Sequence, residues 1–69
     1  MAEAVSYRSI LTDELRAWLH RLADGPQPPP TGQARRTSKR AIDLGWSERR
    51  GDVVTLTDRG REVVAMTKP

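Results

Sequence analysis

Cysteine and phenylalanine are both absent from this 69-residue chain. Without cysteine, the chain has no disulfide framework, no thiol nucleophile and no metal site built on thiolates. Aromatic residues are limited to two tryptophans and one tyrosine, and apolar residues make up 36% of the sequence. A chain of this length and composition is expected to form a single domain with a small core, whose stability a homodimer interface would increase.

Long apolar runs are also missing from the chain. A helix that crosses a bilayer needs about 20 consecutive apolar residues, so no membrane-spanning segment is predicted. The first residues, MAEAVSYRSIL, have neither the basic start nor the apolar segment of a secretory signal. These features predict a cytoplasmic protein without a membrane partner.

Groups that carry out catalysis are scarce. Histidine occurs once, at His20, and none of the serines lies in a Gly-x-Ser-x-Gly nucleophile motif. The adjacent acids Asp13 and Glu14 suit the positive end of a helix better than a catalytic carboxylate pair. The glycines are too widely spaced to cradle a phosphate group. The sequence therefore predicts no enzyme, no metal site, no cofactor and no small-molecule substrate.

Positive charge is concentrated in one segment. The whole chain has a net charge of +3, but residues 35–50 carry six cations against Asp43 and Glu48, which gives +4. The remaining residues carry six cations against seven acids, which gives −1. Such local charge favours a defined anionic partner, nucleic acid above all. The alternative is that the segment is an ordinary solvated face rich in arginine.

The clearest periodic pattern predicts a helix over residues 12–24. Thr12 is suited to cap its N-terminus, and Gly25 followed by Pro26 is suited to end it. Apolar residues recur along this segment at the spacing of one helical face. They are Leu15, Trp18, Leu19 and Leu22. We expect this face to form the core, and the segment GPQPPP that follows to be a stiff connector.

Residues 31–44 predict a second, basic helix with two distinct faces. Thr31 would cap it; the alternative is a shorter helix over residues 38–44, capped by Thr37. Gly45 fits the left-handed position that ends a helix. Four cations fall within an arc of about 140° on a helical wheel: Arg35, Arg36, Lys39 and Arg40. The other side consists of small or apolar residues that can pack: Ala34, Ser38, Ala41, Ile42 and Gly45.

The remaining sequence predicts a β-hairpin and a last helix. Strands are expected at residues 46–49 and 53–57, around the glycine-containing turn Arg50-Gly51-Asp52. The inward-facing side chains of the two strands are expected to be Trp46, Val54 and Leu56. The helix is expected to begin at Thr57 or Asp58. Its inward-facing residues are expected to be Val63, Val64 and, near its end, Met66.

From Thr37 onward, the sequence TSKRAIDLGWSERRGDVVTLTDRGREVV resembles the second half of a winged helix-turn-helix domain. In bacterial regulators of the MarR and PadR type, a Leu-Gly step ends the recognition helix, and a strand and a polar hairpin tip follow. A Leu-Thr-x-x-Gly motif then opens another helix. The corresponding pieces here are Leu44-Gly45-Trp46, residues 48–52, and the run from Leu56 to Gly60.

This resemblance implies an α+β fold, a small winged helix. The expected order is helix, Pro-rich connector, basic helix, two-stranded β-hairpin wing and C-terminal helix. Residues 1–9 are expected to be a flexible N-terminus, and residues 10–67 a single winged-helix domain. One departure is clear: three prolines occupy the interval in which the helix that supports the recognition helix normally lies. That helix is expected to be missing, or shortened to a turn near residues 30–34, as in small phage or excisionase-like regulators.

The resemblance also implies a DNA-binding surface. Its residues on, or leading into, the recognition helix are Arg35, Arg36, Thr37, Ser38, Lys39 and Arg40, and its wing residues are Arg49 and Arg50. Arginine and lysine on a helix reach guanine edges in the major groove, and serine or threonine reaches bases or phosphate. Wing arginines suit the phosphate backbone or the narrow minor groove. The alternative for Arg49 and Arg50 is that they are only solvated hairpin charges.

The predicted function is double-stranded DNA binding, sequence-specific or non-specific, by a small bacterial or phage transcriptional regulator. A palindromic target would require a homodimer. The alternative is a winged-helix module that binds a protein partner without DNA, as an adaptor or phage assembly factor. An exposed tryptophan would favour the protein partner, whereas burial of both Trp18 and Trp46 would favour DNA. DNA binding would also weaken steeply with added salt.

Overall fold

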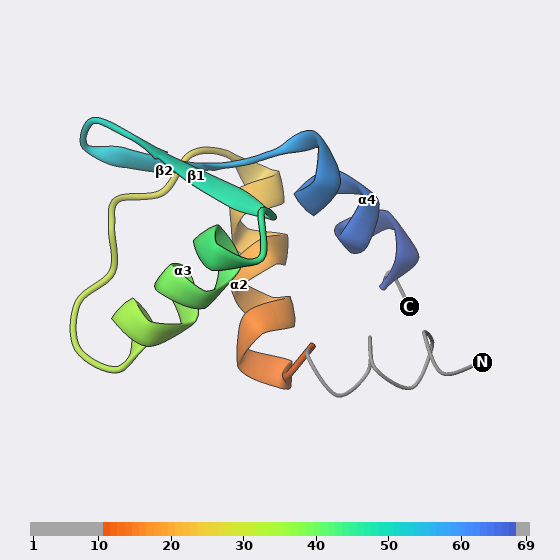
Figure 1. Cartoon of the computed structure of the whole chain (residues 1–69), viewed down its shortest axis with the longest axis horizontal. Helices are drawn as coiled ribbons and strands as arrows, with labels where there is room; N and C mark the ends of the chain where they lie inside the picture. Colours follow the sequence, from red (N-terminus) through yellow and green to blue (C-terminus); the bar gives the residue numbers. More distant parts are fainter. Residues whose placement is uncertain (1–10, 68–69) are drawn as a thin grey trace.

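The computed structural model describes residues 11–67, which form three helices and a two-stranded antiparallel sheet (Figure 1). In chain order the elements are α2 (Asp13–Asp24), α3 (Ala34–Asp43), β1 (Ser47–Arg50), β2 (Val53–Leu56) and α4 (Asp58–Met66). This α+β arrangement, with a hairpin between helices, is winged-helix-like and confirms the predicted fold class. The predicted flexible segment 1–9 lies outside the described residues.

Helix α2 forms as its sequence pattern predicts. The Thr12 hydroxyl accepts a hydrogen bond from the backbone N–H of Leu15 (3.2 Å), which satisfies one free donor of the first turn. At the other end, the N–H of Gly25 donates to the carbonyl of Leu22 (3.1 Å), and Pro26 prevents continuation. The four apolar residues of the predicted face are all buried.

The proline-rich connector contains no helix and is attached to the sheet through one residue. The N–H of Gln27 donates to the carbonyl of Val54 (3.1 Å), and the N–H of Val54 donates to the carbonyl of Gln27 (2.8 Å). Gln27 thus adds a one-residue bridge to the outer edge of β2. Between α2 and α3 there is only a turn at residues 32 and 33, as expected for a shortened supporting helix.

Helix α3 is a single helix, and it begins later than predicted. Gly32 adopts a φ of 65° and turns the chain, so Gln33 takes the N-cap position, without a side-chain cap hydrogen bond. The prediction that Thr31 caps the helix is therefore wrong. The alternative is wrong as well, since Thr37 lies inside the helix. Gly45 follows the C-terminus with a φ of 79°, as predicted.

The packed face of α3 is narrower than predicted. Ser38 and Ala41 are buried, whereas Ala34, also expected on this face, is exposed, and Ile42 is 37% exposed. The expectation that Ile42 belongs to the packed face is wrong, because its position on the wheel lies about 70° from the midpoint of Ser38 and Ala41. Helix α3 therefore meets α2 and β1 through small side chains.

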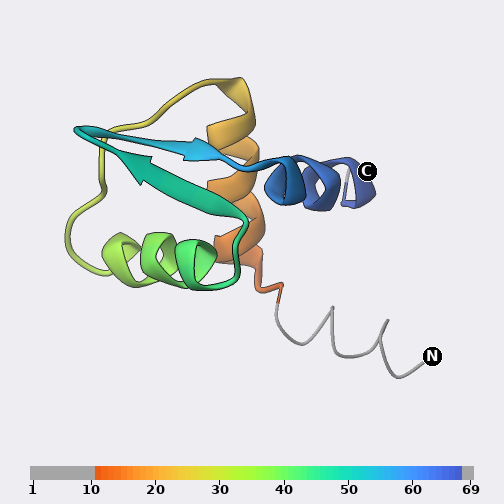
Figure 2. The same cartoon turned by 45° about the horizontal axis from the view of Figure 1, so that its top comes forward.

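The hairpin is tighter than predicted. The register pairs Arg50 with Val53 and Ser47 with Leu56, which leaves a two-residue loop of Gly51 and Asp52. Gly51 has a φ of 60° at the first loop position, the geometry that lets a two-residue loop join twisted antiparallel strands. The first strand is therefore displaced by one residue from the prediction, and the second begins at Val53 as predicted but ends one residue earlier. The hairpin tip and α4 lie at opposite ends of the molecule in both views (Figures 1 and 2).

The start of α4 is held against the segment that precedes β1. Helix α4 begins at Asp58, one of the two predicted starts, and Thr57 is its N-cap: the Thr57 hydroxyl accepts from the N–H of Gly60 (3.1 Å) and donates to the carbonyl of Gly45 (2.6 Å). Gly60 is buried, and a Cβ built on it would overlap the carbonyl oxygen of Trp46 and approach Leu56 Cδ2 to 2.8 Å. The Leu-Thr-x-x-Gly motif therefore has a steric reason in this chain: only glycine lets the helix come this close.

Helix α4 buries Val63 and Val64 as predicted, but Met66 is 71% exposed. The expectation for Met66 is wrong, because its wheel position lies about 110° from the centre of the face formed by Gly60, Val63 and Val64. His20 of α2 is half-buried, and its Nε2 atom lies 3.2 Å from the Thr67 hydroxyl.

One apolar core joins all of these elements. Its buried members are Leu15, Trp18, Leu19, Leu22, Ala41, Trp46, Val54, Val63 and Val64. Leu11, Leu44 and Leu56 pack against it from its margin. Each helix and the inner face of the hairpin contribute, so the described residues behave as one packing unit.

We expect Gly60→Ala to lower the free energy of unfolding by about 1–3 kcal/mol, because the added methyl group overlaps backbone that cannot move without displacing β1. Urea unfolding followed by tryptophan fluorescence measures the change. Glu62→Ala, on the exposed side of the same helix, serves as the control and should stay within about 0.5 kcal/mol of the unmodified protein. Equal stability of the Gly60 variant and the control would contradict the steric role of Gly60.

The two apolar positions Leu19 and Ile42 should respond differently to truncation. Leu19 is 1% exposed, so Leu19→Ala is expected to cost about 2–5 kcal/mol. Ile42→Ala removes a partly solvated side chain and is expected to cost about 1 kcal/mol or less. Thermal unfolding by circular dichroism compares the two, and a larger loss at Ile42 would contradict the packing described above.

Candidate nucleic-acid interface

The exposed face of α3 brings together the four cations that the helical wheel predicts. Every one of these side chains is exposed; they are Arg35, Arg36, Lys39 and Arg40. The opposite face, with Ser38 and Ala41, is buried against the rest of the domain. Within residues 11–67 the salt bridges are those of Arg16 with Asp13 and of Arg50 with Glu48. The cations of α3 therefore have no ionic partner in the described part of the chain.

The positive charge is strongest toward the N-terminal end of α3. Asp43, the one acid of this helix, lies at its C-terminal end and, on the wheel, in the middle of the cationic arc. Sequence reasoning counted Asp43 in the net charge but did not place it on this face. The first turn holds Arg35 and Arg36 and no acid, and the helix dipole adds positive potential there.

The two hydroxyl residues of the predicted site are placed differently from the cations. Ser38 is 6% exposed and Thr37 is half-buried. The prediction groups Ser38 with Lys39 and Arg40, but the structure puts its side chain on the packed face. A buried serine on this face allows close helix packing and is not available to a ligand. Thr37 lies at the border, beside α2.

The wing arginines point to opposite faces of the hairpin, because adjacent residues of a strand alternate. Arg49 is paired with Val54, whose side chain is buried, so Arg49 shares the face that packs on the helices. Its Nε donates to the carbonyl of Gly51 (3.0 Å). Arg50 lies on the outer face with Glu48.

Glu48 is a residue of this region that sequence reasoning left out of the site. Its Oε1 atom accepts a hydrogen bond from Arg50 Nε at 2.8 Å. Both side chains are substantially exposed, so the pair contributes little to stability. It does place a negative charge beside Arg50. The period of two along β1 puts Glu48 and Arg50 on one face and could have revealed the pair.

Two other kinds of feature, a metal-binding cluster and a membrane-spanning helix, are not found in the described residues. In residues 11–67 there is no group of three or more metal-ligating side chains. No helix in this range is long and apolar enough to cross a bilayer.

No known protein family, curated protein or solved structure matches this chain. The likeness to a winged helix therefore stands on its own residues and on the arrangement of α3, the hairpin and α4.

Proposed function

We propose that this protein binds double-stranded DNA, with the exposed face of α3 in the major groove and Arg49 of the wing on the phosphate backbone. The observation that carries this proposal is the set of four exposed α3 cations without ionic partners in residues 11–67, on a helix packed through its opposite face. Unpaired cations on a protruding helix suit a polyanion, because each phosphate contact releases a counterion. In this role the protein is a small bacterial or phage transcriptional regulator of the cytoplasm.

The dimensions of α3 limit what one copy can read. Its ten residues span about 15 Å, which corresponds to about four base pairs of DNA. Arginine and lysine on this face would contact guanine O6 and N7 or the phosphates. A longer, palindromic site would need two copies, so a homodimer on DNA belongs to this proposal.

The competing function is a winged-helix module that binds a protein partner and no DNA. Exposed aromatic side chains are frequent anchors of protein interfaces. Trp18 and Trp46 are only 8% and 6% exposed, so neither provides such an anchor on the surface. Their burial supports the DNA proposal over this alternative.

Replacing Arg36, Lys39 and Arg40 with alanine is expected to weaken binding to random-sequence duplex DNA by at least about tenfold, or 1.4 kcal/mol. The slope of log affinity against log salt should become shallower by about 3, one unit for each lost phosphate contact. Fluorescence anisotropy with a labelled duplex across a salt series measures both quantities. Backbone amide shifts on the same sample should change mainly within residues 34–50.

The matched control removes the same charge elsewhere, by changing Arg16, Arg59 and Arg61 to alanine. These side chains are exposed on α2 and α4, so the fold is retained and the net charge changes equally. The control should retain most of the affinity. An equal loss in both triple variants would show a non-local charge effect, and unchanged affinity in a folded α3 variant would overturn the recognition-helix assignment.

Glu48→Gln is expected to raise DNA affinity by about threefold, because it removes a negative charge at the wing and frees Arg50 from its ion pair. The same anisotropy assay at low salt measures the gain. Glu62→Gln makes an identical chemical change on α4, far from the wing, and should leave affinity unchanged. A gain of the same size in both variants would argue against wing contact with DNA.

A further inference from the structure

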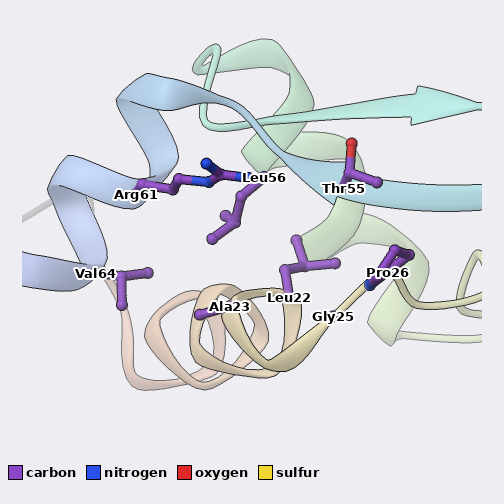
Figure 3. A pocket seen from close by; sticks show the side chains of 8 residues that line it. All are labelled: Leu22, Ala23, Gly25, Pro26, Thr55, Leu56, Arg61 and Val64. Atoms are coloured by element: carbon purple, nitrogen blue, oxygen red, sulfur yellow. The ribbon is translucent and has the colours of Figure 1, made fainter.

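An apolar cavity lies on another part of the molecule, between the end of α2, the connector, β2 and α4 (Figure 3). Its volume is about 290 Å³. Figure 3 shows Leu22, Leu56 and Val64 converging on this space from three different elements, with Ala23 at its lower edge. The cavity is therefore built by tertiary packing and not by one helix face.

One cation stands at the rim of this cavity. Arg61 of α4 lines it and, in Figure 3, extends along its upper side toward Leu56. Within residues 11–67 the guanidinium of Arg61 has no salt bridge. An unpaired guanidinium beside an apolar hole favours a ligand that combines an apolar group with a carboxylate.

The cavity continues into a shallower polar groove. The two share Thr55, Leu56 and Arg61, and the groove extends past Asp58 to Arg50. A small molecule would fill the hole alone, whereas a longer chain uses both: one anchoring side chain in the hole and polar residues along the groove. The shape thus fits a peptide better than a compact ligand.

We propose that this surface binds an extended segment of a partner protein. The segment inserts an aliphatic side chain of leucine size between Leu22, Leu56 and Val64, and the carboxylate of the adjacent acidic residue pairs with Arg61. No residue of α3 lines the cavity or the groove. The cavity is therefore separate from α3, whereas the groove reaches the wing at Glu48 and Arg50.

The test titrates the protein with a capped six-residue peptide, Gly-Ser-Leu-Asp-Ser-Gly, while methyl NMR signals of Leu22, Leu56 and Val64 are recorded. Saturable shifts at these methyl groups are expected. Two control peptides replace the leucine with alanine or the aspartate with asparagine, and each should bind about tenfold more weakly. No saturable shift at millimolar peptide, or shifts centred on α3, would overturn the proposal.

Three variants test whether peptide binding depends on the cavity itself or only on the charge and stability of the protein. Arg61→Gln should abolish the preference for aspartate over asparagine in the peptide, whereas Arg59→Gln, on the same helix but outside the cavity, should retain it. Ala23→Leu adds bulk at an exposed position on the cavity edge and should weaken the peptide about tenfold while the protein stays folded. Binding that is unaffected by Arg61→Gln or by Ala23→Leu would overturn the proposal.

Discussion

The backbone of Trp46 connects three elements of this fold. Its N–H donates to the carbonyl of Ala41 in α3 (2.9 Å), and its carbonyl accepts from the N–H of Thr57 (3.1 Å). The Thr57 hydroxyl bonds to Gly45 and to the N–H of Gly60, which packs directly on the Trp46 carbonyl. The end of α3, the base of the hairpin and the start of α4 are thus held at one point. The direction in which α3 presents its charge depends on this junction.

Helix α3 is held at its C-terminal end and packs through small side chains, which explains why its long side chains are all available to solvent. Ser38 and Ala41 let the helix approach α2 and β1 closely, so the cations must project outward. On the α2 side, the bridge between Gln27 and Val54 ties the connector to the sheet. The same tie brings the connector beside β2 and α4, where the apolar cavity forms. One packing arrangement thus accounts for both proposed surfaces.

Predictions from the sequence were accurate where a local pattern has one structural solution. The apolar spacing of α2, the start of the last helix at Asp58 and the left-handed turn at Gly45 each depend on residues within a few positions, and each is found in the structure. Predictions were less accurate for apolar residues at the edges of the packed helix faces. Ile42 and Met66 are apolar, but the packed faces of their helices are narrow, and neither position falls within them.

By itself, the sequence determined the order of elements, the apolar face of α2 and the local concentration of positive charge, because these follow from spacing and composition. Only the tertiary structure decided which side chains are exposed to a ligand and where a cavity forms. Whether Ser38 faces a ligand or the core depends on where α2 lies. The cavity beside Arg61 likewise needs α2, β2 and α4 in place. Contacts between residues distant in the chain carry no periodic signal, so only the assembled core reveals them.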